Sequence, residues 1–118
     1  MNTLQASRLA GAVSPMVRRA KAYIAGHHAD PIGLHELSKA MHVSIFYFCK
    51  IFKKATGMTF TDYLGRVRVE KAKNLLLNPH LRIGEIAYAV GFQSLTHFNR
   101  VFLELTGQSP TTFRGTLK

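Results

Sequence analysis

The chain has 118 residues, the length of one ordinary domain, and 47% of them are hydrophobic, which is enough to fill a core and argues against simple disorder. Sixteen Lys and Arg residues oppose six Asp and Glu residues, so the formal net charge is +10. This excess predicts attraction to a polyanion, with nucleic acid as the first expectation and an anionic membrane surface as the second. The single cysteine, Cys49, excludes an intrachain disulfide and a four-cysteine zinc site.

The N-terminal third of the sequence predicts two helices. Residues 1–13 contain small and polar residues without a clear cap, and we interpret them as a leader or the remnant of a linker. Ser14-Pro15 then predicts a helix start, with Ser as the N-cap and Pro at the first helical position. The break at Asp30-Pro31 ends this helix, and a short helix is expected over 34–41.

The rest of the chain repeats a pattern of a cap, an apolar helical face and a terminating Gly or Pro. The helices expected from it are 44–56, 61–77, 83–90, 94–106 and a last short one that begins at Ser109-Pro110. No segment alternates with period two between turn signals. We therefore predict an all-α fold of about seven helices.

An internal repeat is the most informative feature of the sequence. Glu36, Leu37, Ala40 and Val43 reappear 49 positions later as Glu85, Ile86, Ala89 and Phe92. One additional residue in the turn then shifts the offset to 50, and the matched pairs are Ser44 and Ser94, Phe48 and Phe98, Lys50 and Arg100, Phe52 and Phe102, Thr56 and Thr106, and Gly57 and Gly107. Each copy is a short helix, a tight turn and a longer helix, which is the order of a helix-turn-helix unit.

Two generic helical hairpins in a bundle are the competing interpretation of this repeat. The caps, the glycines and an exposed basic residue lie in register in both copies, which favours DNA binding. We predict a first helix-turn-helix subdomain over 14–59, a linker helix over 60–78 and a second subdomain over 79–118. A helix of about 17 residues spans about 25 Å, so two recognition helices joined by it could approach the ~34 Å repeat of B-DNA. One chain would then enter two successive major grooves without dimer symmetry.

The residues at this point resemble a known family. The stretch from Ile83 to Arg114 reads I-x-E-I-A-x-x-V-G-F-x-S-x-x-x-F-x-R-x-F-x-x-x-T-G-x-S-P-x-x-F-R and is similar to the C-terminal signature of AraC/XylS-type transcription regulators. The preceding part fits the rest of that domain at Ser44, Phe52-Lys53, Gly57, Phe60, Tyr63-Leu64, Arg68, Ala72 and Leu75-Leu76. The resemblance covers about residues 15–116 and implies a bacterial transcription factor domain with two helix-turn-helix units.

The resemblance also implies partners. It implies double-stranded DNA, and the family includes activators that touch RNA polymerase. Its members usually carry a further sensing or dimerisation domain, most often N-terminal. We therefore expect this chain to be the DNA-binding part of a longer regulator, rather than a stand-alone small one, with the effector or dimerisation domain outside it.

By position, the resemblance places base contacts near the start of both recognition helices. They fall on Phe46, Cys49 and Lys50 in the first unit and on Leu95, Thr96, Asn99 and Arg100 in the second. Arg100 can pair bidentately with guanine and Asn99 with adenine. In the first unit only Lys50 is a strong donor. Phe46 and Cys49 offer apolar contacts, for instance to thymine methyl groups, where relatives often have polar residues. For Phe46 the competing interpretation is partial packing on the preceding helix. For Leu95 core packing is the favoured interpretation, because its twin Ile45 is also apolar.

Phosphate contacts are expected at helix N-termini, where free N–H groups and the helix dipole favour an anion. The candidates, including one basic side chain, are Ser44, Lys53, Thr59, Phe60, Thr61, Ser94, His97, Ser109 and Thr111. For the Ser and Thr residues, capping alone is the competing interpretation, and His97 and its equivalent Tyr47 could instead cover a neighbouring side chain. We expect Arg68 to be structural and paired with an acid such as Glu36 or Glu85.

Other function classes have little support in the sequence. The six His residues show neither zinc-finger spacing nor an H-E-x-x-H motif, and no phosphate loop, nucleophile elbow or paired-carboxylate pattern is present. We therefore expect no metal, no cofactor and no enzymatic activity. A basic helical module that binds RNA polymerase or an acidic partner is the serious alternative. Membrane-surface binding is the weaker one, because no helix joins a strongly apolar face to a Lys-rich face throughout.

The expected compartment follows from two further absences. No stretch approaches 18 apolar residues, as a membrane span requires. The N-terminus lacks a basic run followed by an apolar stretch, as a secretory signal requires. Together with the single cysteine, these features predict a reducing, cytoplasmic location and no membrane partner.

Overall fold

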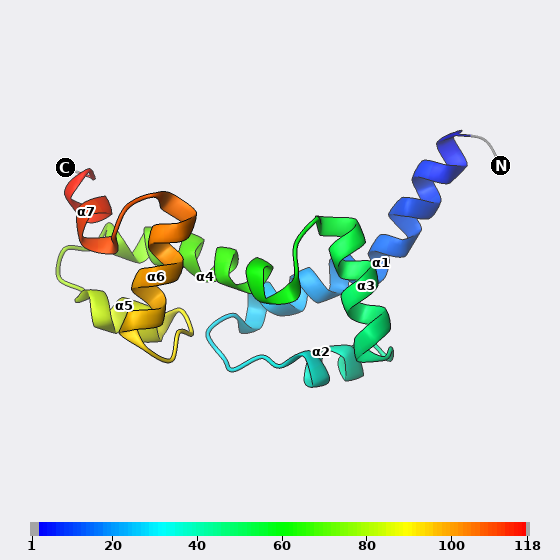
Figure 1. The fold of residues 1–118 in the computed structure, drawn as a ribbon, viewed down its shortest axis with the longest axis horizontal. Helices are drawn as coiled ribbons and strands as arrows, with labels where there is room; N and C mark the ends of the chain where they lie inside the picture. The colour runs from blue at the N-terminus through cyan, green and yellow to red at the C-terminus, as the bar shows by residue number, and fades with distance from the viewer. Residues whose placement is uncertain (1–2, 118) are drawn as a thin grey trace. The chain divides into compact units, whose positions relative to one another are not determined.

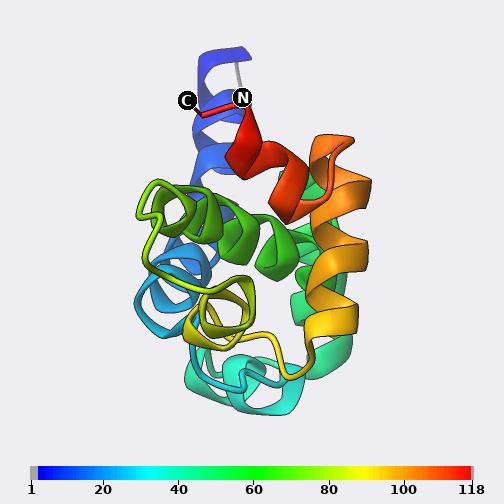
Figure 2. The same ribbon diagram turned by 90° about the vertical axis from the view of Figure 1, so that its left-hand side faces the viewer.

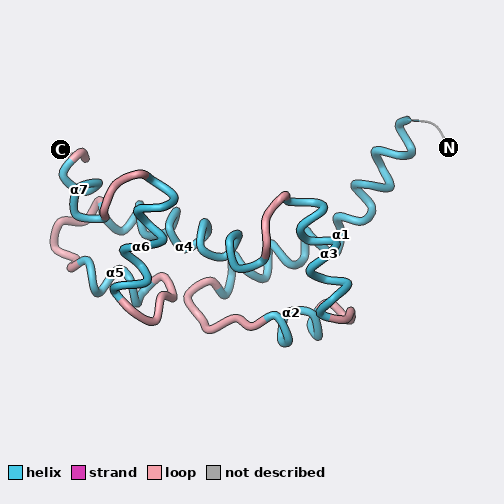
Figure 3. Tube along the Cα trace, viewed as in Figure 1, coloured by secondary structure: helices cyan, strands magenta, loops and turns pink. Residues whose placement is uncertain are grey.

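The computed structural model describes residues 3–117, and within them it contains helices and no strand (Figures 1 and 3). The seven helices are α1 (Thr3–His27), α2 (Leu34–Ala40), α3 (Ile45–Thr56), α4 (Phe60–Leu76), α5 (Ile83–Ala89), α6 (Leu95–Thr106) and α7 (Pro110–Gly115). The predicted all-α fold is confirmed, and α4 begins and ends one residue before its predicted bounds.

The chain divides into two compact units, which we call unit 1 and unit 2. Unit 1 contains the residues up to His27 together with Ile32–Tyr63, and unit 2 contains His28–Pro31 together with the residues from Leu64 onward. The first turn of α4 therefore belongs to unit 1 and the remainder of that helix to unit 2.

In unit 1, the recognition helix α3 packs against both α1 and α2. Its two inward phenylalanines, Phe48 and Phe52, are completely buried. Their rings lie 5.4 Å apart, Phe48 meets Phe60 edge-on at 6.4 Å, and Phe52 meets Tyr63 edge-on at 5.3 Å. Aromatic pairs at such separations add to the stability that burial already provides, so α3 is held to its unit along one face only.

Unit 2 builds the same arrangement around α6, with α5 near its N-terminal end and α7 near its C-terminal end (Figure 2). Phe98 and Phe102 are again completely buried, with ring centroids 5.6 Å apart. Their core neighbours come from α4, from α5 and from the turn after α5, namely Val69, Ala72, Leu76, Ile86, Ala87, Val90 and Phe92.

Capping interactions explain where the recognition helices begin and end. The Ser44 hydroxyl accepts a hydrogen bond from the Tyr47 N–H at 3.1 Å, and the Ser94 hydroxyl accepts one from the His97 N–H at 3.0 Å. At the other end, Gly57 and Gly107 adopt left-handed conformations with φ of 75° and 79°. This conformation is easy for glycine and costly for other residues. The caps predicted from the sequence are thereby confirmed in both copies of the repeat.

The repeat extends to side-chain hydrogen bonds just before these glycines. The Thr56 hydroxyl lies 2.8 Å from the Phe52 carbonyl and 3.1 Å from the Met58 carbonyl. The Thr106 hydroxyl makes the corresponding contacts with the Phe102 and Gln108 carbonyls at 2.8 and 2.9 Å. The two units therefore end their recognition helices by the same local chemistry.

The predicted start of the first helix at Ser14 is wrong. Helix α1 runs from Thr3 to His27 and contains Pro15 in its interior. Residues 3–13 are rich in Leu, Ala, Gln and Arg, which have high helix propensity. An interior proline removes one backbone hydrogen bond and crowds the preceding turn, and here it does not end the helix. Whether 1–13 is a leader or linker remnant stays a prediction.

Candidate nucleic-acid interface

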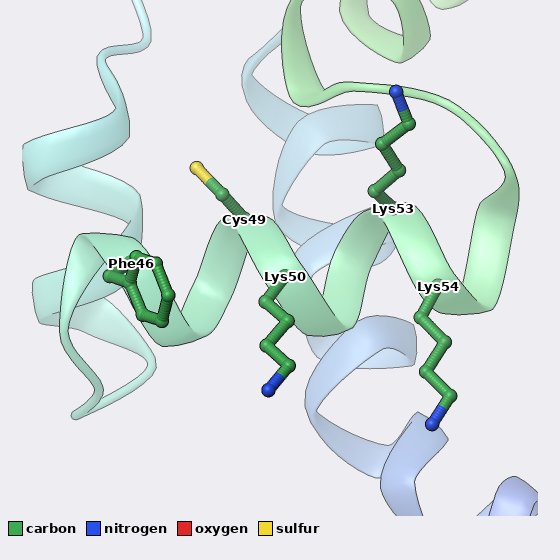
Figure 4. A pocket seen from close by; sticks show the side chains of 5 residues that line it. All are labelled: Phe46, Cys49, Lys50, Lys53 and Lys54. Carbon is green, nitrogen blue, oxygen red and sulfur yellow. The ribbon is translucent and has the colours of Figure 1, made fainter.

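The outward face of α3 combines one large aromatic ring with three lysines. Phe46 is 78% exposed, and Lys50, Lys53 and Lys54 are exposed beside it, whereas Cys49 is half-buried. Together these five side chains line an open hollow of about 520 Å³. Cys49 and Lys53 project to one side of the helix and Lys50 and Lys54 to the other (Figure 4). The structure thus brings together on one surface the three base-reading residues predicted for the first unit.

The outward face of α6 carries different chemistry at the matching positions. Thr96, Asn99 and Arg100 are all exposed, opposite the buried Phe98 and Phe102. The three polar residues predicted to read bases in the second unit therefore share one accessible face. Side chains on it can donate to and accept from base edges.

The two faces also differ in charge. Helix α3 contains three lysines and no acidic residue, whereas Arg100 is followed on α6 by the exposed Glu104. The positions that match Lys53 and Lys54 are Leu103 and Glu104. The α3 face therefore offers three cations to a polyanion, while on the α6 face the single arginine is offset by one carboxylate.

The core packing favoured for Leu95 is wrong, and the partial packing considered for Phe46 is not supported. Leu95 is 39% exposed, its twin Ile45 is 41% exposed, and Phe46 is the most exposed large hydrophobic residue described. Leu95 and Ile45 are the first residues of their helices, one turn before the buried Phe98 and Phe48. An apolar residue at that end lies beyond the contact with the core, which its amino-acid type alone does not reveal.

The predicted phosphate-contacting hydroxyls all lie at helix starts. Ser44, Ser94 and Ser109 are the N-caps of α3, α6 and α7. The Thr59 hydroxyl accepts a hydrogen bond of 3.1 Å from the Asp62 N–H at the start of α4. Capping occupies these hydroxyls and leaves other first-turn N–H groups pointing outward.

The remaining phosphate candidates differ in how accessible they are. Thr61, Thr111 and Lys53 are exposed. Phe60 is 7% exposed and packs on Phe48, so its backbone N–H is the only group it can present to a phosphate.

His97 shows a contact that the sequence left open. Its ring meets the buried Phe92 edge-on, with centroids 5.5 Å apart and planes at 76°. It thus covers a neighbouring side chain, which was the alternative to phosphate contact, while the residue itself remains exposed. Its equivalent, Tyr47, is 47% exposed.

Arg68 is structural, as predicted, but the acid partner expected for it is wrong. Its Nε donates to the His28 carbonyl at 2.7 Å and its Nη2 to the Asp30 carbonyl at 3.0 Å. Glu85 instead accepts a hydrogen bond from the Arg82 N–H and caps α5. Both carbonyl oxygens belong to the chain just after α1, and the planar guanidinium fork can serve the two of them at once.

Arg114 repeats this arrangement at the end of α4. Its Nε donates to the Leu76 carbonyl at 3.2 Å and its Nη2 to the Asn78 carbonyl at 3.0 Å. These contacts give Arg114 a structural role at the end of α4. Burial lowers the pKa of Arg68 below its ordinary value, but an arginine stays protonated at neutral pH.

Lys54 was not predicted from the sequence as a specific contact to DNA. The structure places it on the wall of the α3 hollow. The signal for it was its spacing of four residues from Lys50, which places both side chains on one side of a helix.

Two features of the described residues bear on the alternatives to nucleic-acid binding. Among the described residues, no group of three or more His, Cys, Asp and Glu side chains is arranged to hold a metal ion. The helices over the same part of the chain are all too short or too polar to cross a membrane.

The chain is similar in sequence to a known domain family and to several known proteins. A helix-turn-helix domain family matches residues 37–116. The Msm operon regulatory protein of Streptococcus mutans is 33% identical over 98 residues, which are 83% of this chain and 35% of that protein. AdaA of Bacillus subtilis, a bifunctional transcriptional activator and DNA repair enzyme, is 35% identical over 92 residues, 78% of this chain and 44% of that protein. The chain thus spans less than half the length of either relative.

A solved structure shows the same fold. The C-terminal domain of AraT, a response regulator from Geobacillus stearothermophilus, superposes with a TM-score of 0.83 at 36% sequence identity. The match covers 88% of this chain and 87% of that one. The all-α fold of this chain is therefore shared with that domain.

Proposed function

Because the chain belongs to the AraC/XylS family of helix-turn-helix transcription regulators, we propose that it binds double-stranded DNA sequence-specifically and regulates bacterial transcription. In this proposal α3 and α6 are the two recognition helices. The buried phenylalanine faces anchor them, and their outward faces meet the bases.

One observation carries the proposal, namely that the same capped recognition helix is built twice with an accessible face of base-reading chemistry each time. In unit 1 that face holds Phe46, Cys49 and Lys50, and in unit 2 it holds Leu95, Thr96, Asn99 and Arg100. An α-helix fits the major groove of B-DNA, where each base pair presents a distinct set of donors, acceptors and methyl groups.

We propose that the two helices enter successive major grooves of one duplex. Helix α4 has 17 residues, which at 1.5 Å per residue extend about 25 Å, and successive turns of B-DNA repeat every ~34 Å. The length of α4 together with its flanking turns supports a span of this size between the two recognition helices. A bipartite site read by one chain then follows, without dimer symmetry.

Phosphate contacts position the protein in this proposal and carry no sequence information themselves. The exposed Lys53 and Lys54 and the N-termini of α3, α4, α6 and α7 supply them. The net charge of +10 supports a large total contribution from these contacts, since the affinity gained by neutralising phosphates grows with the number of counterions released.

Further parts of the proposal concern the whole protein. The relatives above extend well beyond the matched region, which supports an effector or dimerisation domain outside these residues. We include RNA polymerase as a second partner and the cytoplasm, where bacterial DNA lies, as the location. The chain itself acts by binding and not by catalysis.

A salt titration with two duplexes tests the proposal. One duplex is selected from a random library by the 118-residue chain, and the other is scrambled. We expect log K to fall linearly with log[salt] on both, with several counterions released, and the selected duplex to bind at least a hundredfold more tightly. Equal affinity for both duplexes and for an anionic vesicle would contradict sequence-specific binding.

The spacing is tested by inserting base pairs between the two halves of the selected site. An insertion of five base pairs turns the second groove to the opposite side of the duplex, so we expect affinity to fall to that of one half-site. Unchanged affinity would contradict simultaneous binding by two helices.

A further inference from the structure

We propose that α3 reads its half-site through the C5-methyl groups of thymine, with Phe46 as the specificity-determining residue. The inference rests on the proposed function and deepens it by naming the base chemistry of one half-site. It assigns a different mode of recognition to each of the two helices.

The first argument is the exposure of Phe46. A phenylalanine that is 78% exposed on the outward face of a helix has a large apolar surface with no use inside its own unit. Its inward neighbours Phe48 and Phe52 are themselves completely buried. A ring in this position gains by covering an apolar group of a partner, roughly in proportion to the area removed from water.

The second argument is the chemistry around the ring. The hollow it lines is completed by the half-buried Cys49 and by Lys50, Lys53 and Lys54. The ring of Phe46 and the sulfur of Cys49 form the part near the start of α3, and the ammonium groups of Lys50, Lys53 and Lys54 lie further along the helix (Figure 4). An occupant that suits this surface is apolar where it touches Phe46 and anionic further along the helix.

The major groove of DNA at a thymine has this combination. Thymine presents a C5-methyl group and an O4 acceptor there, and phosphates border the groove. Lys50 can donate to O4 or to a guanine while Phe46 covers the methyl group, and Lys53 and Lys54 can approach phosphates. The other three bases offer no methyl group in the groove, so the contact selects thymine.

The contrast with α6 supports the assignment. At the position that matches Phe46, α6 has Thr96, and at the position that matches Cys49 it has Asn99. Asn99 and Arg100 are the residue types that make bidentate hydrogen bonds to adenine and guanine. Helix α3 has neither residue type. Hydrogen bonds from Lys50 alone would leave most bases of its half-site without direct contact, and contacts to thymine methyl groups would supply the missing readout.

The experiment replaces thymine by deoxyuridine, which removes only the C5-methyl group. The half-sites are first assigned on the selected duplex: positions whose base preference is lost with Arg100→Ala belong to α6, and the other half belongs to α3. Each thymine of the α3 half is then replaced, and affinity of the full chain is measured by fluorescence anisotropy at fixed salt. We expect a loss of about fourfold for each methyl group covered, from the transfer free energy of a single methyl or methylene group.

Variants at Phe46 connect the loss to this residue. With Phe46→Ala, thymine and deoxyuridine duplexes should bind equally, whereas Phe46→Leu should keep most of the methyl effect. Leu77, which is 63% exposed and lies outside the recognition helices, provides the control, and Leu77→Ala should behave like the unaltered chain. Since Phe46 is exposed, thermal unfolding of Phe46→Ala should be unchanged.

The outcomes separate the inference from the proposed function. An α3 half-site without thymine, no loss with deoxyuridine, or an equal loss in the chain and in Phe46→Ala each overturns the inference while specific DNA binding stands. Failure to bind any selected duplex better than a scrambled one overturns both.

Discussion

The guanidinium of Arg68 donates a hydrogen bond of 2.7 Å to the backbone carbonyl of His28, forty residues earlier in the chain. A second bond of 3.0 Å reaches the carbonyl of Asp30. The same guanidinium lies 5.8 Å from the ring centroid of the buried Phe92, in the turn of the second helix-turn-helix unit. One side chain therefore holds the segment after α1 against that turn.

Replacing Arg68 by alanine should lower the free energy of unfolding by about 2 kcal/mol. Hydrogen bonds from a charged donor are worth more than neutral ones, and two carbonyls would lose their partner. Arg68→Lys should recover less than half of the loss, because one ammonium cannot reproduce the planar fork. Urea denaturation followed by circular dichroism measures both values.

The exposed Arg66, two residues before Arg68 on the same helix, provides the matched control. Arg66→Ala should change the unfolding free energy by less than about 0.5 kcal/mol, as most surface substitutions do. Equal effects of the two substitutions would contradict a structural role for the Arg68 hydrogen bonds.

Gly91 cannot accept a side chain without moving this contact. It adopts φ of 108°, and a Cβ there would lie 2.7 Å from Arg68 Nε and still closer to the His28 carbonyl oxygen. Gly107 also has a positive φ, of 79°, but nothing lies within 4 Å of its Cβ position. Gly91→Ala should therefore cost about 3 kcal/mol or more, from backbone strain plus overlap, and Gly107→Ala about 1–2 kcal/mol, from strain alone.

Thermal unfolding of both glycine variants checks this difference. The comparison isolates the overlap, because both positions require the left-handed backbone. If the two variants unfold at the same temperature, the close approach of Gly91 to the His28 carbonyl has no energetic weight.

His42 occupies the matching turn of unit 1 and is the only non-glycine residue with positive φ among those described, at 59°. A side chain with a Cβ pays for this conformation, whereas glycine does not. His42→Gly should raise the unfolding free energy by about 0.5–1 kcal/mol, after the larger entropy loss of glycine on folding is subtracted. The reverse result, a clear loss of stability in guanidinium denaturation, would show that the His42 side chain itself stabilises the turn.

Alanine substitutions of Arg100 and Lys53 should affect DNA binding in different ways. Arg100→Ala should cost about 1–3 kcal/mol on the selected site and little on a scrambled duplex, because a base contact is lost. Lys53→Ala should weaken both duplexes alike and reduce the slope of log K against log[salt] by about one, because a phosphate contact is lost. A uniform loss for Arg100→Ala would place that residue on phosphate.

The features that the sequence predicted correctly depend on neighbours in the chain. Ser44 and Ser94 cap the recognition helices through N–H groups three residues away, and Gly57 and Gly107 end them through their own backbone conformation. Buried faces follow from helical periodicity. Because these signals act over a few residues, and because they occur twice, the helices, their order and the division of inward from outward faces could be predicted without coordinates.

The sequence by itself thus determined an all-α chain with two similar units and the residues that face outward from each recognition helix. Only the tertiary structure decided that Arg68 serves the carbonyls of His28 and Asp30 instead of an acid, that His97 covers Phe92, and that Leu95 stays outside the core. These contacts depend on which backbone groups and surfaces come together where one element ends beside another. Residue type and spacing do not encode these contacts, because they arise only once the elements are packed against one another.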